Sequence, residues 1–189
     1  IGVLIISTMV IAWRKWRQSG RKETRFSPLF PTLLFGFVCL QGAFGAWTVT
    51  MKLQPIIVTT HLLLGMGLLA LLAWLGARQT DHAPVSQAAA ALRLPAVLAA
   101  LLLTVQIALG GWVSSNYAAL ACTDFPLCHG ALLPQMDLAN GFTLWRDLGM
   151  TAKGEYLPFP ALIAIHWAHR VFALVVILLV AKVALSALK

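Results

Sequence analysis

Charged residues are scarce in this chain, and their scarcity excludes an ordinary soluble domain. Only 11% of the 189 residues are charged, whereas 60% are hydrophobic. Soluble domains carry roughly 25% charged residues. The apolar residues also lie in long blocks. The composition therefore indicates a membrane protein in contact with lipid, not a soluble domain with a large core.

Acidic residues are rarer still. The chain has 6 Asp and Glu against 14 Lys and Arg, which gives a net charge of +8. On a soluble domain this excess would suggest a nucleic-acid partner. Here most of the cations lie between the apolar blocks, where membrane topology explains them better. We therefore expect no nucleic-acid partner.

Four apolar blocks are long enough to cross a membrane, since a helix needs about 20 residues to span ~30 Å of hydrocarbon. They are residues 29–51, 55–77, 94–115 and 159–188. We predict an all-α fold, a polytopic bundle of membrane helices. The opening block, residues 1–12, is too short to span. We expect it to be the end of a helix whose start is missing, and the chain to be a fragment of a longer protein.

The distribution of Lys and Arg predicts the orientation in the membrane. The strongly basic loop 13–26 should be cytoplasmic, and so should loop 78–93, which has Arg78 and Arg93 against Asp81. The long loop 116–158 is mainly acidic and should lie outside. We therefore expect a multi-pass protein of a bacterial inner (plasma) membrane.

An internal similarity divides the chain into two parts. QGAFGAWTV begins at Gln41 and QIALGGWVS begins at Gln106, so both read Q-x-A-x-G-x-W at the outer end of a span. Each is followed by a span with histidine in its outer part. Small residues let helices pack closely, and they also leave room for a flat, bulky group. We assign residues 1–78 to the end of a first half, 79–93 to a cytoplasmic linker and 94–189 to the start of a second half.

Two histidines on separate spans lie in the outer half of the predicted membrane. His61 comes six residues after Pro55, and His169 comes nine after Pro160. At 1.5 Å per residue these depths are about 9 and 14 Å. Ionisable groups in a span usually face the bundle interior. For His61 two interpretations stay open: a ligand, or a neutral histidine bonded to a neighbouring helix.

Arg170 beside His169 favours a large cofactor. Neighbours on a helix point about 100° apart, so the two side chains would contact different parts of one ligand. Heme fits this pattern, because its iron binds imidazole and its propionates suit an arginine fork. His166 lies one turn from His169 on the same face. A small metal site formed by these two histidines is less favoured, because no third ligand is nearby in the sequence.

Cysteine is rare as well, with three in the chain. Cys122 and Cys128 flank TDFPL in the predicted outer loop, in an oxidising location. We predict a disulfide that fastens loop 116–158 as a cap over the bundle. The alternative is a catalytic dithiol that passes electrons to quinone. The lack of a tight C-x-x-C motif disfavours it.

Several stretches together resemble the heme A synthases of the cytochrome oxidase assembly family. They are LQGAFGAWTV…IIVTTHLLLG, and above all QIALGGWVSSNYAALACTDFPLCHG followed by IHWAHRVFA. The resemblance covers nearly the whole chain. It implies an eight-helix bundle of two similar four-helix halves, each with a heme site between its second and fourth helices. On that map the chain runs from helix two to helix six, and the partner ligands from helices two and eight lie outside it.

The resemblance also implies an activity and a role for each candidate residue. An oxidoreductase of this family oxidises the C8 methyl of heme O to the formyl of heme A by successive hydroxylations with oxygen from water. His61 would bind the iron of heme O or heme A. His169, with Arg170 at a propionate, would bind a heme b that carries electrons away. His166 occupies the position of the first half's catalytic glutamate, which would precede residue 1, so we assign no catalytic residue within the chain. Cys122 and Cys128 match the family's outer-loop pair.

Two other functions remain as alternatives. One is a bis-histidine electron carrier of the cytochrome b type, and the other is a quinone-linked thiol oxidoreductase that works through the cysteine pair. The resemblance suggests heme O synthase and cytochrome oxidase assembly factors as partners, and it allows a homo-oligomer. The sequence identifies no electron acceptor.

Overall fold

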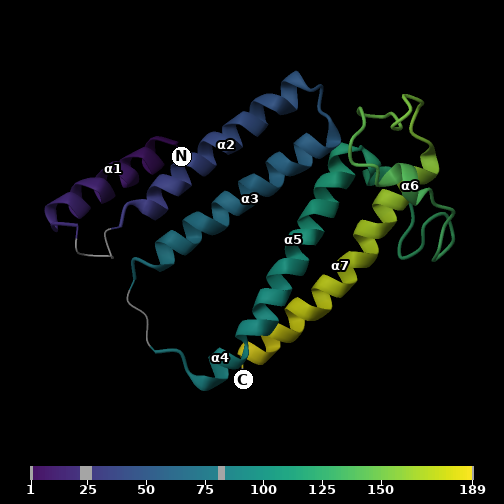
Figure 1. Cartoon of the computed structure of the whole chain (residues 1–189). Helices are drawn as coiled ribbons and strands as arrows, with labels where there is room; N and C mark the ends of the chain where they lie inside the picture. The colour runs from purple at the N-terminus through teal and green to yellow at the C-terminus, as the bar shows by residue number, and fades with distance from the viewer. Residues whose placement is uncertain (1, 22–26, 81–83, 189) are drawn as a thin grey trace.

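The fold is all-helical where a computed structural model of the chain describes it, over residues 2–21, 27–80 and 84–188. Four helices are long and apolar enough to cross a membrane. They are α2 (Leu29–Thr50), α3 (Pro55–Ala77), α5 (Arg93–Ser115) and α7 (Phe159–Ala187), shown in Figure 1. Their bounds agree with the predicted blocks to within one residue at each end. The prediction of an all-α polytopic membrane bundle is confirmed.

The first helix is longer than the sequence suggested. α1 (Gly2–Gln18) continues past residue 12 through WRKWRQ, so the prediction that a loop begins at residue 13 is wrong. Arg, Lys and Gln are good helix formers. Trp13 and Trp16 also pack edge to face at 5.5 Å, and Trp13 Nε1 donates a hydrogen bond of 3.1 Å to Thr32 Oγ1 on α2. Residues 22–26, the rest of the basic stretch, lie outside the described residues.

The first hairpin, α2–α3, turns within four residues. Lys52 and Leu53 adopt left-handed conformations with φ of 50° and 58°. Pro55 then begins α3, where its fixed φ suits the first helical turn and its missing N–H removes no bond. A small core between α1, α2 and α3 is formed by Ile5, Leu34 and Leu68.

The second hairpin, α5–α7, is connected by a folded cap. Residues 116–158 contain the short helices η2 (Ala118–Leu120) and α6 (Leu138–Gly141), and both contact α7. At the other end of α5, a short helix that the sequence did not predict, α4 (Gln87–Ala91), leads into the span. Ser86 Oγ caps α4 by accepting a hydrogen bond from the Ala89 N–H. Residues 81–83 of the predicted linker lie outside the described residues.

The two hairpins meet at the end that carries the cap and diverge toward α4 (Figure 1). At the junction Thr59 Oγ1 of α3 and Ser115 Oγ of α5 are 3.3 Å apart and share a hydrogen bond. Gly111 makes this approach possible, because a Cβ there would lie 2.8 Å from Leu62 Cδ2. The candidate ligands described next lie close to this junction.

Candidate functional site

His61 lies against α2, where a glycine makes room for its ring. A Cβ on Gly45 would be 3.1 Å from His61 Cε1, which is tighter than ordinary van der Waals contact. Nδ1 of His61 is buried and has no hydrogen-bond partner in the described part of the chain. The same is true of Oε1 of Gln41, one helical turn before Gly45. The buried Nδ1 therefore has no bond of the kind expected for a neutral histidine held by a neighbouring helix.

His169 repeats this arrangement between α5 and α7. A Cβ on Gly110 would be 3.1 Å from His169 Cε1. Here the glutamine does contact the histidine. Gln106 Nε2 lies 3.0 Å from His169 Nδ1 and donates a hydrogen bond of 3.2 Å to the His169 carbonyl. Gln106 Oε1 is buried without a partner among the described residues. The Q-x-A-x-G-x-W repeat therefore places a glycine against each histidine, and its second glutamine also contacts the ring.

The residues present fit a heme. Each glycine lets an imidazole, a ligand that iron takes, lie close to the backbone of the facing helix. A buried polar atom without a hydrogen bond costs about 1–3 kcal/mol, and such atoms cluster around both histidines. Iron-ligating histidines donate their other ring N–H to an acceptor. A half-turn of the Gln106 carboxamide would bring its Oε1 to His169 Nδ1 and supply that acceptor, with loss of the bond to the His169 carbonyl.

His166 is bonded to the cap, residues 116–158. Its Nδ1 accepts a hydrogen bond of 3.1 Å from the Cys122 backbone N–H. A neutral histidine that accepts at Nδ1 carries its proton on Nε2, which then has no lone pair for a metal. A backbone N–H cannot turn away as the Gln106 amide can, so this contact favours His169 as the ligand. Among the described residues, no group of three or more His, Cys, Asp or Glu side chains is placed to hold a metal ion.

Arg170 also binds the cap. Its Nη2 donates 2.8 Å to the Asp124 carbonyl, and its Nη1 donates 3.3 Å to the Leu127 carbonyl. Its guanidinium lies 5.0 Å from the centre of the Phe125 ring, at a distance typical of cation–π contact. The predicted contact with a heme propionate remains a prediction, because in this structure the guanidinium faces the loop.

Trp167, between these residues, donates a hydrogen bond of 2.8 Å from Nε1 to the Leu132 carbonyl. His166, Trp167 and Arg170 thus all bind main-chain atoms of residues 122–132. We call these three side chains the clasp. The clasp surrounds His169 in the sequence, so the position of the cap is coupled to the helix that carries the candidate ligand.

The predicted disulfide is confirmed. Cys122 and Cys128 are bonded and buried, with exposed fractions of 7% and 1%. Within the loop that they close, the Asp124 carboxylate accepts hydrogen bonds from the N–H groups of His129 and Gly130, at 2.7 and 2.9 Å. These bonds, that of Gly130 foremost, hold the pKa of Asp124 below its ordinary value.

Arg146 is a buried cation that sequence reasoning missed. Its side chain is 3% exposed, and it donates 2.6 Å to Asn116 Oδ1 and 3.2 Å to the Met150 carbonyl. Burial lowers the pKa of its guanidinium, which lies over the Trp112 ring. Trp112 in turn donates 2.8 Å to the Gly141 carbonyl. The one sequence feature that could have indicated this contact is the repeated Trp, whose second copy, Trp112, anchors the cap.

Comparison with known proteins agrees with this architecture. A family model described as cytochrome oxidase assembly protein (COX15-CtaA) matches residues 1–189. The chain is 42% identical over 150 residues to the heme A synthase of Shewanella oneidensis, a match covering 78% of this chain and 44% of the relative. It is 39% identical over 113 residues to that of Methylobacterium nodulans, covering 56% and 31% of the two chains. For that of Erythrobacter litoralis the identity is 35% over 123 residues, covering 59% and 35%.

The chain spans less than half the length of these curated relatives. No solved structure matches it. The family model nevertheless covers every residue, and the relatives share one name. The chain therefore belongs to the cytochrome oxidase assembly protein family, as its resemblance to the heme A synthases indicated.

Proposed function

We propose that this chain is part of a membrane oxidoreductase of heme A biosynthesis, which oxidises the C8 methyl of heme O to the formyl of heme A. The methyl carbon takes its oxygen from water and gives up electrons and protons in equal number. The observation that carries the proposal is that a glycine at matching positions lets each half-buried histidine lie against the facing helix, with buried polar atoms that have no partner among the described residues on both hairpins. The similarity of the chain to proteins named heme A synthase also supports the proposal.

The two sites have different roles in this proposal. His61 would hold the substrate, heme O, and then the product, heme A, by the iron. His169 would hold heme b, which when bound supplies a redox centre for the released electrons. Gly45 and Gly110 let each ring lie close to the backbone of the facing helix, and Gln106 orients the His169 ring. The cap excludes water from the outer end of the second site.

The catalytic group and the second axial ligands would come from parts of the protein outside this chain. In this chain His166 stands where the first half would carry a glutamate, and it binds the backbone of the cap instead. We place the protein in a bacterial inner membrane with loop 116–158 outside, because the basic segments lie at the opposite ends of the spans. Heme O synthase and assembly factors of cytochrome oxidase are the partners that this role suggests, and a homo-oligomer is compatible with it.

A bis-histidine electron carrier is the second candidate, because His61 and His169 lie in matching surroundings. The thiol oxidoreductase is less supported. Thiol–disulfide exchange requires access to a sulfur atom, and Cys122 and Cys128 are both buried.

Pigment analysis of the full-length protein, expressed with a supply of heme O, tests the proposal. The unmodified protein should yield heme A, and His61→Ala should abolish it. His129→Gln, which changes an exposed histidine of the cap, should not. Heme A formed at the normal level by His61→Ala would refute the assignment of this site. Heme b alone, with quinol reactivity, would favour the carrier. Loss of activity in Cys122→Ser with intact heme binding would favour the thiol enzyme.

A further inference from the structure

The two glutamines of the repeat lie differently against the helices that carry the histidines. Gln106 Nε2 lies 3.0 Å from His169 Nδ1. Gln41 makes no hydrogen bond with His61, because His61 Nδ1 and Gln41 Oε1 are both buried without a partner among the described residues. Its Nε2 lies instead against Gly65, where a Cβ would be only 3.0 Å away. The same side chain in the same motif thus takes two positions, so a residue outside the motif accounts for the difference.

The register of the helices shows which residue faces each glutamine. The two helices of each hairpin run antiparallel (Figure 1), so one turn back on the first helix faces one turn forward on the second. In both hairpins the glutamine comes one turn before the contact glycine, whose Cβ would lie 3.1 Å from the histidine Cε1. Residue 173, one turn after His169, therefore faces Gln106 as Gly65 faces Gln41. The chain has glycine at position 65 and alanine at position 173.

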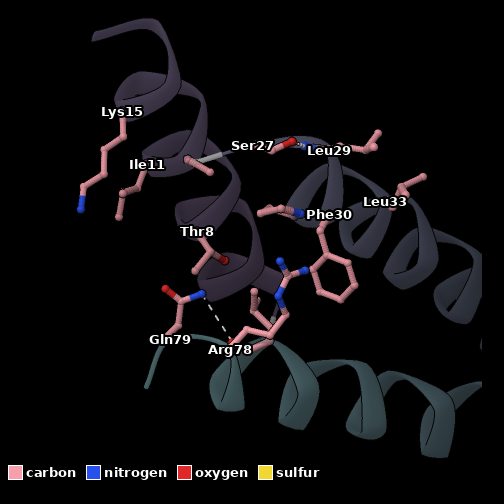
Figure 2. Close-up of a pocket in the computed structure, with 12 residues that line it drawn as sticks. Thr8, Ile11, Lys15, Ser27, Leu29, Phe30, Leu33, Arg78 and Gln79 are labelled. Carbon is pink, nitrogen blue, oxygen red and sulfur yellow. Dashed lines mark hydrogen bonds between the residues drawn. The ribbon is translucent and has the colours of Figure 1, made fainter. Parts of the chain in front are cut away.

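Open space does not explain the position of Gln41. A cavity of about 530 Å³ borders the first hairpin, but it lies at the other end, between the last turns of α1, the start of α2 and the end of α3 (Figure 2). Neither Gln41 nor Gly65 lines this cavity. Gln41 and Gln106 are also both partly buried. The difference that remains beside the two glutamines is the methyl group of Ala173.

We propose that the residue one turn after each histidine positions the facing glutamine, and thereby decides whether the imidazole is held. Gly65 lets the Gln41 carboxamide lie against bare backbone, away from the ring. The methyl group of Ala173 leaves no such place, and Gln106 lies on the His169 ring. A glutamine oxygen that accepts from the second imidazole N–H fixes the ring and makes it a more basic ligand. The inference rests on the proposed function, since it explains why one site would exchange its heme and the other would keep it.

Exchange of these two positioning residues in the full-length protein tests the inference. In Gly65→Ala the Gln41 carboxamide should move onto the His61 ring, so that heme O binds about tenfold more tightly and its midpoint potential falls. In Ala173→Gly the Gln106 side chain should leave the ring, so that heme b binds about tenfold more weakly and its potential rises. Heme titration and potentiometry measure these changes.

A double-mutant cycle shows whether the glutamines carry these effects. The effect of Gly65→Ala should vanish in a Gln41→Ala background, and that of Ala173→Gly should vanish in a Gln106→Ala background. Effects that persisted without the glutamines would overturn the proposal, because they would come from helix packing alone.

Gly67→Ala is the matched control on α3. It adds the same methyl group, and alanine is the better helix former in both variants. Its Cβ would meet Phe37 Cζ at 3.4 Å and no glutamine. Gly67→Ala should therefore leave the heme affinity and midpoint potential unchanged. A change equal to that of Gly65→Ala would overturn the proposal.

A measurement without heme distinguishes failure of this inference from failure of the proposed function. NMR of the heme-depleted full-length protein with isotopically labelled histidine should show a hydrogen-bonded Nδ1 for His61 in Gly65→Ala, but not in the unmodified protein. An unchanged His61 signal would overturn the inference, whatever heme the protein makes. A changed signal in a protein that bound heme at neither histidine would support the positioning of the glutamine and refute the proposed function.

Discussion

The two hairpins use one motif with different results. In α2–α3 and in α5–α7 a glycine admits a histidine ring at the same close distance. The connections differ, since the first hairpin turns within four residues and the second carries the cap. The two copies of the repeated tryptophan differ in the same way. Trp47 is 45% exposed, whereas Trp112 is 4% exposed and bonded to the cap. The motif thus fixes how closely the helices approach, and the connection decides how fully the surrounding side chains are ordered.

The histidines themselves show the same contrast. His61 Nδ1 is buried without a partner, whereas His169 Nδ1 is held by Gln106. A ring held before its ligand arrives suits a resident cofactor. A ring without a fixed partner can adapt to a substrate that must enter and leave. The difference therefore agrees with the proposed division into a substrate site and an electron-transfer site.

The largest effect is expected when each imidazole is removed from the full-length protein. If His169 binds the iron of heme b as proposed, His169→Ala should lose this heme and its optical spectrum completely, because the ligand is gone. His61→Ala should keep that spectrum. Optical spectra and heme extraction measure both. If the two variants lost the same pigment, the sites would not be distinct.

Removal of each glutamine should separate the hairpins further. Loss of an outer-shell partner of a metal ligand typically weakens metal binding 10–100-fold, and we expect this of Gln106→Ala for heme b. Gln41→Ala should change heme binding by less than about threefold, since the structure gives Gln41 no bond to His61. Gln106→Glu, which keeps an acceptor, should recover most of the affinity and lower the midpoint potential. Heme titration and potentiometry measure these effects, and equal losses from both alanine variants would remove the contrast.

Alanine at the glycines tests what the hairpins share. In Gly45→Ala and Gly110→Ala the new Cβ would lie 3.1 Å from the ring, so each imidazole must move by a few tenths of an ångström. We expect similar losses of heme affinity at the two sites, of about tenfold or less. Gly42→Ala is the control, because its Cβ would meet no atom within 4 Å. Alanine favours helix by about 1 kcal/mol over glycine, so a loss of heme binding with an unchanged circular dichroism spectrum would identify the ring contact as the cause.

The smallest expected effect is confined to the cap. The lowered pKa of Asp124 means that its carboxylate stabilises the fold above its unfolded pKa, about 4, and that this stabilisation is lost as the pH falls through the lower folded value. Asp124→Asn should therefore melt at a lower temperature than the unmodified protein at pH 7, and the gap should narrow as the pH falls below about 4. A gap that did not narrow in acid would contradict a contribution from the charge.

Much of the fold was predictable from the sequence, because apolar blocks of spanning length identify membrane helices directly. The sequence also indicated the histidines, because polar groups within apolar runs are costly. It indicated the disulfide, because two cysteines lie close together in a predicted outer loop. The sequence indicated the contact between Gln106 and His169 only through the repeated glutamine, since a sequence does not show which helices face each other. The role of Arg146 had no pattern at all, because its partners are an amide and a carbonyl far apart in the chain.

The clasp has a consequence for how substitutions are tolerated. Every loop atom to which it hydrogen-bonds belongs to the main chain: the carbonyls of Asp124, Leu127 and Leu132, and the N–H of Cys122. A substitution of Leu127 or Leu132 leaves the backbone carbonyl in place. A substitution of His166, Trp167 or Arg170 removes the side chain that forms the hydrogen bond. The exposed side chains of the loop can therefore be substituted, and the molecules that bind the loop can differ accordingly. The positions on α7 that hold the loop tolerate little substitution.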